Sequence, residues 1–148
     1  MKKLLIMVVA CLLLITGCNL KKEETIKENE NGNVIVYKRY SNYGAEEEMS
    51  NYYYITVTSD KKITWGKIKS DIKSKELTDK EYQEIIDMAF TQSFKDIGTD
   101  ISDESVLDGY SSYITLYYND GEEFKTGGLN PNNTKYNNLV KKLNSYTN

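Results

Sequence analysis

The stretch LTDKEYQEIIDMAF, residues 77–90, sets the architecture, because the spacing of apolar residues changes here from that of a strand to that of a helix. The residues expected on one buried helix face are Tyr82, Ile85, Ile86, Ala89 and Phe90. Thr78, followed three residues later by Glu81, forms a capping box that marks the helix start. The pattern predicts a helix that begins after Thr78 and ends near residues 94–96.

Upstream of this helix, three segments are rich in β-branched and aromatic residues, which is typical of strands. They are residues 33–40 (NVIVYKRY), 52–58 (YYYITVT) and 63–69 (ITWGKIK). The polar run SDKK at 59–62 is a turn signal between the second and third segments. We therefore expect these two strands to form a hairpin, with Trp65 on either face.

Downstream of the helix, residues 110–118 (YSSYITLYY) alternate as a strand, and NDG at 119–121 is a hairpin signal. EEFKT at 122–126 is the expected partner strand, and Gly127 and Gly128 are expected to break it. The asparagines of NPNN are candidate caps for a last helix. Its apolar residues are Tyr136, Leu139, Val140 and Leu143.

The order β-β-β-α-β-β-α predicts an α+β domain with two helices on one face of a mainly antiparallel sheet of about five strands. We expect this single domain to cover residues 34–148. Residues 18–33 before it are charged and almost free of apolar side chains, so they are predicted to be a flexible tether.

The first residues resemble a secretion signal. Lys2 and Lys3 precede an uncharged apolar run, 4–15, which is too short for a membrane-spanning helix and has the length of a signal-peptide core. The residues Ile15, Thr16, Gly17 and Cys18 then resemble the lipobox of bacterial lipoproteins. The resemblance implies cleavage after residue 17, a diacylglyceryl thioether on Cys18, and attachment to the membrane through that lipid. An ordinary secretory signal cut elsewhere, or a core strand, is the alternative.

The composition bears on the expected partners and on the expected location of the protein. The whole chain has 19 basic and 22 acidic residues, so loss of Lys2 and Lys3 with the signal leaves 17 basic residues and a net charge of −5. Such a chain, with its lysines scattered, is not expected to bind nucleic acid. Lysine outnumbers arginine eighteen to one, which indicates a low-GC genome and an expected location on the outer face of the plasma membrane.

Catalysis is not expected, and neither is a cofactor. KTGG at 125–128 and SDIK at 70–73 resemble motifs of penicillin-binding proteins and serine β-lactamases, but the domain is about half the size of that fold. The chain has no histidine, and its cysteines are Cys11, in the signal, and Cys18. The commonest general base and zinc ligands are therefore missing. A small envelope hydrolase that uses two carboxylates is the enzymatic alternative.

An acidic loop is a weak candidate for calcium. Its carboxylates are Asp100, Asp103, Glu104 and Asp108. The EF-hand pattern fails because Ser105 stands where the turn glycine belongs. The other interpretation is a solvated loop without metal.

The tyrosine-rich strands carry the candidate binding face. Alternation places aliphatic side chains on one face of each strand and tyrosine or threonine on the other. The candidates are Tyr52, Tyr54, Thr56, Tyr113, Thr115 and Tyr117. If the two strands turn these residues to the same side, they form an aromatic, hydroxylated platform suited to binding. The alternative is that β-propensity and codon bias alone account for them.

Residues 108–143 resemble the hairpin-plus-helix ending of small uncharacterised lipoproteins of low-GC bacteria, a resemblance that transfers no functional residue. The expected function is a membrane-anchored, extracytoplasmic, non-catalytic binding module with a protein or peptide partner. A specific alternative is an immunity-type lipoprotein that sequesters a membrane-active peptide. A structural accessory to a membrane complex is a further possibility.

Overall fold

Six strands and three helices form the described part of the computed structural model, which covers residues 29–41, 52–67, 70, 72–106, 109–118 and 121–147. The strands are β1 (Asn33–Ser41), β2 (Tyr53–Thr58), β3 (Lys62–Lys67), β4 (Lys73–Glu76), β5 (Tyr110–Tyr117) and β6 (Glu123–Leu129). The helices are α2 (Asp79–Ala89), α3 (Gln92–Lys95) and α4 (Thr134–Asn144). The expected signal peptide, Cys18, the first part of the expected tether, and Asp108 lie outside the described residues.

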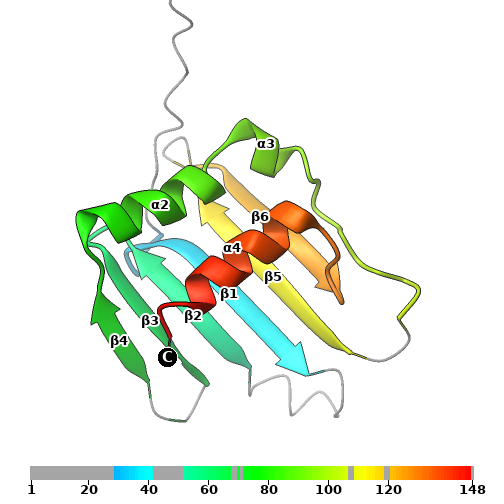
Figure 1. Ribbon diagram of the computed structural model, residues 1–148, viewed down its shortest axis with the longest axis horizontal. Helices are drawn as coiled ribbons and strands as arrows, with labels where there is room; N and C mark the ends of the chain where they lie inside the picture. Colours follow the sequence, from blue (N-terminus) through cyan, green and yellow to red (C-terminus); the bar gives the residue numbers. More distant parts are fainter. Residues whose placement is uncertain are drawn as a thin grey trace, which may run out of the picture.

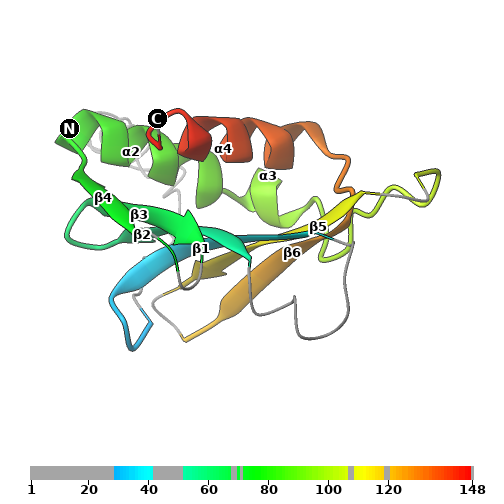
Figure 2. The ribbon, with the colours of Figure 1, turned by 90° about the horizontal axis from the view of Figure 1, so that it is seen from below.

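The strands form one sheet in the order β4-β3-β2-β1-β5-β6, and every neighbouring pair is antiparallel. All three helices lie over the same face of the sheet (Figures 1 and 2). The predicted α+β class is confirmed, with one strand and one helix more than expected. In the described chain, no helix is both long enough and apolar enough to cross a membrane.

The core lies between this helical layer and the sheet. Tyr37 of β1 pairs with Ile55 of β2 on one side and Ile114 of β5 on the other, and directly opposed residues point to the same face. All three are buried, as are Ile85 of α2 and Leu139 of α4 above them. Each fully buried aliphatic side chain contributes roughly 1.5–3 kcal/mol to folding. This helical face is therefore the one that holds the domain together.

The start of α2 follows the sequence closely. Glu81 donates its backbone N–H to the Thr78 hydroxyl at 3.2 Å, and the Thr78 backbone N–H donates to the Glu81 carboxylate at 2.8 Å, so the predicted capping box is confirmed. Asn133 caps α4 in a similar way, with its side chain accepting from Lys135 and Tyr136. Trp65 pairs with Ile55, and this pairing places Trp65 on the helical face.

The predicted end of the first helix is wrong. The helix α2 ends at Ala89, and Phe90 leaves the helical region with φ −95° and ψ 61°. The hydroxyl of Thr91 accepts a hydrogen bond from the Phe94 backbone at 3.1 Å and so caps a separate helix, α3. A threonine hydroxyl that takes a backbone N–H in this way competes with continuation of the helix. The break still leaves Phe94 in the core, where it is 1% exposed.

The strand β4 was not predicted. It contains no apolar residue, and all four of its side chains are exposed. Its extended conformation follows from the hydrogen-bond ladder with β3, in which Ser74 pairs with Thr64. Pairing with a neighbour, rather than an apolar pattern, therefore makes this segment a strand.

The predicted strand break at Gly127 and Gly128 is also wrong. Both glycines lie within β6, with φ of +149° and +141°, and pair with Tyr113 and Ser112. A Cβ on Gly127 would lie 2.1 Å from the Ser112 carbonyl oxygen, so only glycine allows β5 and β6 to approach this closely. The predicted hairpin itself is confirmed by the antiparallel pairing of β5 and β6, although Asn119 and Asp120 lie outside the described residues.

A loop segment, residues 99–103, runs along the outer edge of β6. The Gly127 backbone N–H donates to the Thr99 carbonyl at 3.2 Å, and the Gly127 carbonyl accepts from Ile101 at 2.9 Å. Farther along, the Leu129 carbonyl accepts from Asp103 at 2.9 Å. The end of β6 therefore has backbone partners on both sides.

Candidate binding face on the open side of the sheet

The face of the sheet opposite the helices, here called the open face, is covered by no described helix (Figure 2). Strand register decides which side chains it carries. Lys38 of β1 stands between Tyr54 of β2 and Tyr113 of β5. One step along, Val36 likewise stands between Thr56 and Thr115. Residues opposed in this way share a face, and these alternate with the buried residues of the core.

The six residues of the predicted face therefore lie together on the open face. Tyr52, Tyr54, Thr56 and Tyr117 line one hollow, and Tyr113, Thr115 and Tyr117 line a second one beside it. The condition set by the sequence, that both strands turn these side chains to the same side, is met. Whether the face binds a ligand stays a prediction.

Four aromatic rings cross the open face as a continuous row, here called the tyrosine row. Its members in order are Tyr54, Tyr52, Tyr40 and Tyr113. Successive ring centroids are 6.3, 5.1 and 6.5 Å apart, in tilted or edge-to-face arrangements. Such pairs are worth roughly 0.5–1.5 kcal/mol each. The row is therefore held in place before any ligand arrives.

Two lysines lie over this row. The Lys38 ammonium is 5.2 Å from the centre of the Tyr52 ring, and the Lys125 ammonium is 4.7 Å from that of Tyr113. Burial raises the pKa of Tyr40 above its ordinary value, although the nearby Lys38 lowers it in part. The Tyr40 phenol is thus protonated at neutral pH and can donate a hydrogen bond. Among the residues that the structure describes, no carboxylate forms a salt bridge with either lysine.

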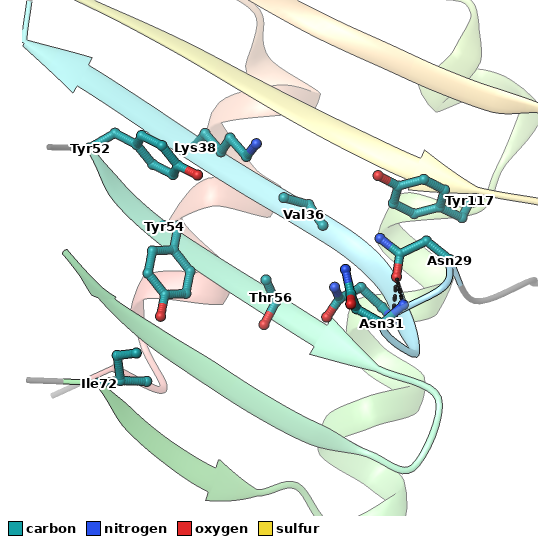
Figure 3. Close-up of a pocket in the computed structure, with 10 residues that line it drawn as sticks. Asn29, Asn31, Val36, Lys38, Tyr52, Tyr54, Thr56, Ile72 and Tyr117 are labelled. Atoms are coloured by element: carbon teal, nitrogen blue, oxygen red, sulfur yellow. Dashed lines mark hydrogen bonds between the residues drawn. The ribbon is translucent and has the colours of Figure 1, made fainter. Parts of the chain in front are cut away.

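The larger hollow, here called the main groove, has a volume of about 430 Å³, which is within the range of ligand pockets. Figure 3 shows Val36 and Thr56 at its floor, between Tyr54 and Tyr117. The other residues that line it are Asn29, Asn31, Asn33, Lys38, Tyr52 and Ile72. Ile72, which is 63% exposed, forms the apolar rim on the β4 side.

A turn at the start of the described chain forms the opposite rim. The Asn29 side-chain oxygen accepts from the backbone N–H groups of Asn31 and Asn33, at 2.9 and 3.0 Å. Two backbone bonds, from Gly32 to Asn29 and from Asn29 to Asn33, complete the turn. The last residues of the range expected to be a tether are thus folded against the groove.

The second hollow, of about 170 Å³, adjoins the main groove. The two share Val36, Lys38 and Tyr117, so one elongated ligand could occupy both. Its other charged residues are Lys125 and, at the β5–β6 hairpin, Glu123. The whole lining therefore carries two positive charges and one negative charge, on a chain whose net charge is −3.

Several residues of this face were not among those predicted from the sequence. Val36, Lys38 and Tyr40 come from β1, which was predicted as a strand but not divided into its two faces. The signal was present, because these three alternate with the buried Ile35 and Tyr37. Lys125, from the KTGG motif, lies on the open face, whereas the next residue, Thr126, is buried and donates its hydroxyl to the Gly98 carbonyl at 2.7 Å.

The weak calcium candidate looks different in the structure. Asp100 accepts from the Ser102 hydroxyl and backbone N–H, and Asp103 accepts from those of Ser105. These hydrogen bonds, the serine hydroxyl first, lower the pKa of both carboxyls. Glu104 is exposed, and within the described chain no three potential ligands gather as a metal site. Asp100 and Asp103 thus shape the loop that runs along β6.

Comparison of the chain with protein-family models, with curated proteins and with solved structures finds no match.

Proposed function

We propose that the protein is a non-catalytic binding module, held by a lipid on Cys18 at the outer surface of the plasma membrane, and that its open face binds the ligand. One observation carries this proposal: the tyrosine row and the main groove lie side by side on a sheet face that no described helix covers. Tyrosine offers a large contact area with few rotatable bonds, so little conformational entropy is lost on binding.

The position of the groove fits attachment at the membrane. Asn29, at the groove rim, lies within the predicted tether, 18–33, and residues 19–28 of that range separate it from Cys18. A flexible chain of this length has a typical reach of roughly 17 Å. A domain anchored at Cys18 would keep the groove close to the membrane surface, where envelope components are concentrated.

The residues that line the two hollows also bear on the two alternative functions, a carboxylate hydrolase and an immunity-type lipoprotein. A carboxylate hydrolase needs two carboxyl groups about 5–10 Å apart, and the residues that line the main groove include none. Membrane-active peptides of the amphipathic type are rich in lysine and arginine, and on this face they would meet Lys38 and Lys125. The positive charge of Lys38 and Lys125 on the open face would repel such a cationic peptide. The open face is therefore better suited to a ligand without positive charge than to the peptide that an immunity protein of this type would bind.

The test is a comparison of partner capture from envelope extract by the wild type, the Tyr52→Ser, Tyr117→Ser double variant and a Tyr146→Ser control. Tyr146 packs on the helical side beside Lys142, away from the groove. We expect the double variant to lose capture by one to two orders of magnitude, as for other aromatic anchors. Because Tyr52 contacts the rings of both Tyr40 and Tyr54, the stability of the double variant should fall by about 1–3 kcal/mol. Unchanged capture by a folded double variant would contradict the proposal.

A further inference from the structure

The open face offers a ligand side chains rather than backbone. The strands β2, β1 and β5 are interior strands, so their N–H and C=O groups are already paired on both sides. Peptides that join a sheet through backbone hydrogen bonds add at an edge, and that mode is closed to a ligand lying across these strands. Recognition here depends on side-chain groups.

These side-chain groups are mostly amides and hydroxyls. They belong to Asn29, Asn31, Asn33, Tyr52, Tyr54, Thr56 and Tyr117. Amide and hydroxyl groups both donate and accept hydrogen bonds, as the hydroxyl groups of a sugar do. In addition, the rings of Tyr54 and Tyr117 line the main groove, and no described lysine lies over either of them, so the C–H surface of a sugar ring could pack there.

The charge of the main groove indicates that its ligand carries an acidic group. Lys38 is the cation of the main groove, and no carboxylate lines that groove. Lys125 stands in the adjoining hollow, which shares Lys38 with the main groove. An anionic group seated beside Lys38 would complete a charge-assisted hydrogen bond at a position where the described chain supplies no counterion.

We propose that the open face binds a short anionic oligosaccharide, with an acid group at the Lys38 ammonium and different sugar rings of the same ligand against Tyr54 and Tyr117. The two adjoining hollows, about 430 and 170 Å³, hold successive rings. This inference rests on the proposed function, because it names the ligand class of the same face.

The experiment titrates the full chain, processed in a lipoprotein-producing host and held in nanodiscs of neutral lipid. Isothermal calorimetry measures binding of trigalacturonate, of its methyl ester and of triglutamate. The ester keeps the sugar skeleton without the charge, and triglutamate keeps the charge without the sugar. We expect trigalacturonate to bind at least about tenfold more tightly than either control ligand, the effect of about one charge-assisted hydrogen bond.

Two matched variants test whether trigalacturonate binds at the open face. Lys38→Gln should weaken trigalacturonate about tenfold, whereas Lys141→Gln, which removes an exposed charge on the helical side, should leave the affinity unchanged. Trp65 is on the helical face, so its fluorescence in a denaturation series reports folding rather than ligand contact.

Each other outcome overturns the inference. Equal affinity for the ester would show that charge plays no part, and equal affinity for triglutamate would indicate an acidic peptide instead. If no trisaccharide binds while envelope capture still depends on Tyr52 and Tyr117, the ligand class is wrong and the proposed function stands. If neither trisaccharide binding nor envelope capture depends on Tyr52 and Tyr117 in folded variants, the proposed function fails as well.

Discussion

The hydroxyl of Ser112 on β5 lies 2.8 Å from the hydroxyl of Tyr136 on α4, and both side chains are buried. Ser112 also acts on the Tyr37 phenol of β1, because it partly offsets the rise in the pKa of Tyr37 that burial causes. Burial raises the pKa of Tyr136, which keeps its phenol protonated throughout the physiological range. The core is therefore not purely apolar where α4 meets the sheet.

Tyr136→Phe should lower the free energy of unfolding by about 1–2 kcal/mol, because it removes one buried hydrogen bond without leaving a cavity. Urea denaturation followed by Trp65 fluorescence measures the change. Tyr117→Phe, which removes a hydroxyl on the open face, is the control and should stay within about 0.5 kcal/mol of the wild type. Equal effects of the two substitutions would show that the Ser112–Tyr136 bond adds nothing.

The capping box of α2 predicts an acid-sensitive step. Hydrogen bonds from the Thr78 backbone, the Lys75 ammonium and the Thr78 hydroxyl lower the pKa of Glu81 to about 2. A carboxyl group with a lowered folded-state pKa stabilises the protein above its unfolded pKa, near 4.3, and this contribution is lost as the pH falls. Glu81→Gln should therefore flatten the decline of the urea midpoint between about pH 5 and pH 2.

The same pH series on Glu104→Gln is the control for Glu81, since Glu104 is exposed on the acidic loop. We expect that variant to follow the wild-type curve. A Glu81→Gln curve that also follows the wild type would show that the capping box does not contribute to acid stability.

Gly127→Ala should destabilise the protein by more than about 3 kcal/mol, because the new Cβ meets the Ser112 backbone at 2.1 Å and φ is +149°. The control is Gly121→Ala at the β5–β6 hairpin. It also has positive φ, +86°, but open space around it, so it should cost only about 1 kcal/mol. Chemical denaturation of both variants checks this, and equal losses would refute the role of close strand approach.

Cys18→Ala should abolish labelling of the protein by lipid in a lipoprotein-producing bacterium, because the thioether to diacylglycerol needs the thiol. The protein should then accumulate uncut or be shed from the cells. Phase partitioning in detergent is the second measurement. A variant that enters the detergent phase as the wild type does would refute lipid attachment at Cys18.

The sequence predicts those elements whose signals are local. The Thr78–Glu81 box and the apolar spacing around Ile85 fix α2, because capping and periodicity act within a few residues. The end of α2 was misplaced because Phe90 and Phe94 continue the helical spacing, while the Thr91 cap interrupts the backbone between them. A cap inside a periodic segment is a weak signal until its hydrogen bond is seen.

Features created by neighbouring strands were not predictable in the same way. The polar β4 becomes extended only because β3 pairs with it, and Gly127 stays in β6 because the 99–103 segment pairs along its edge. On the open face, alternation placed Tyr54 and Tyr113 correctly relative to their own strands. Only the sheet order, which puts Lys38 between them, makes them parts of one site.

The 99–103 segment has a consequence for how copies of the domain meet. An unpaired strand edge would let the sheet of one copy continue into the sheet of the next. At the β6 side, the end of the strand is already paired with the protein's own loop. At the other side, the outermost strand has only four residues, KSKE, all exposed and mostly charged. Crowded copies should therefore stay separate molecules rather than polymerise edge to edge.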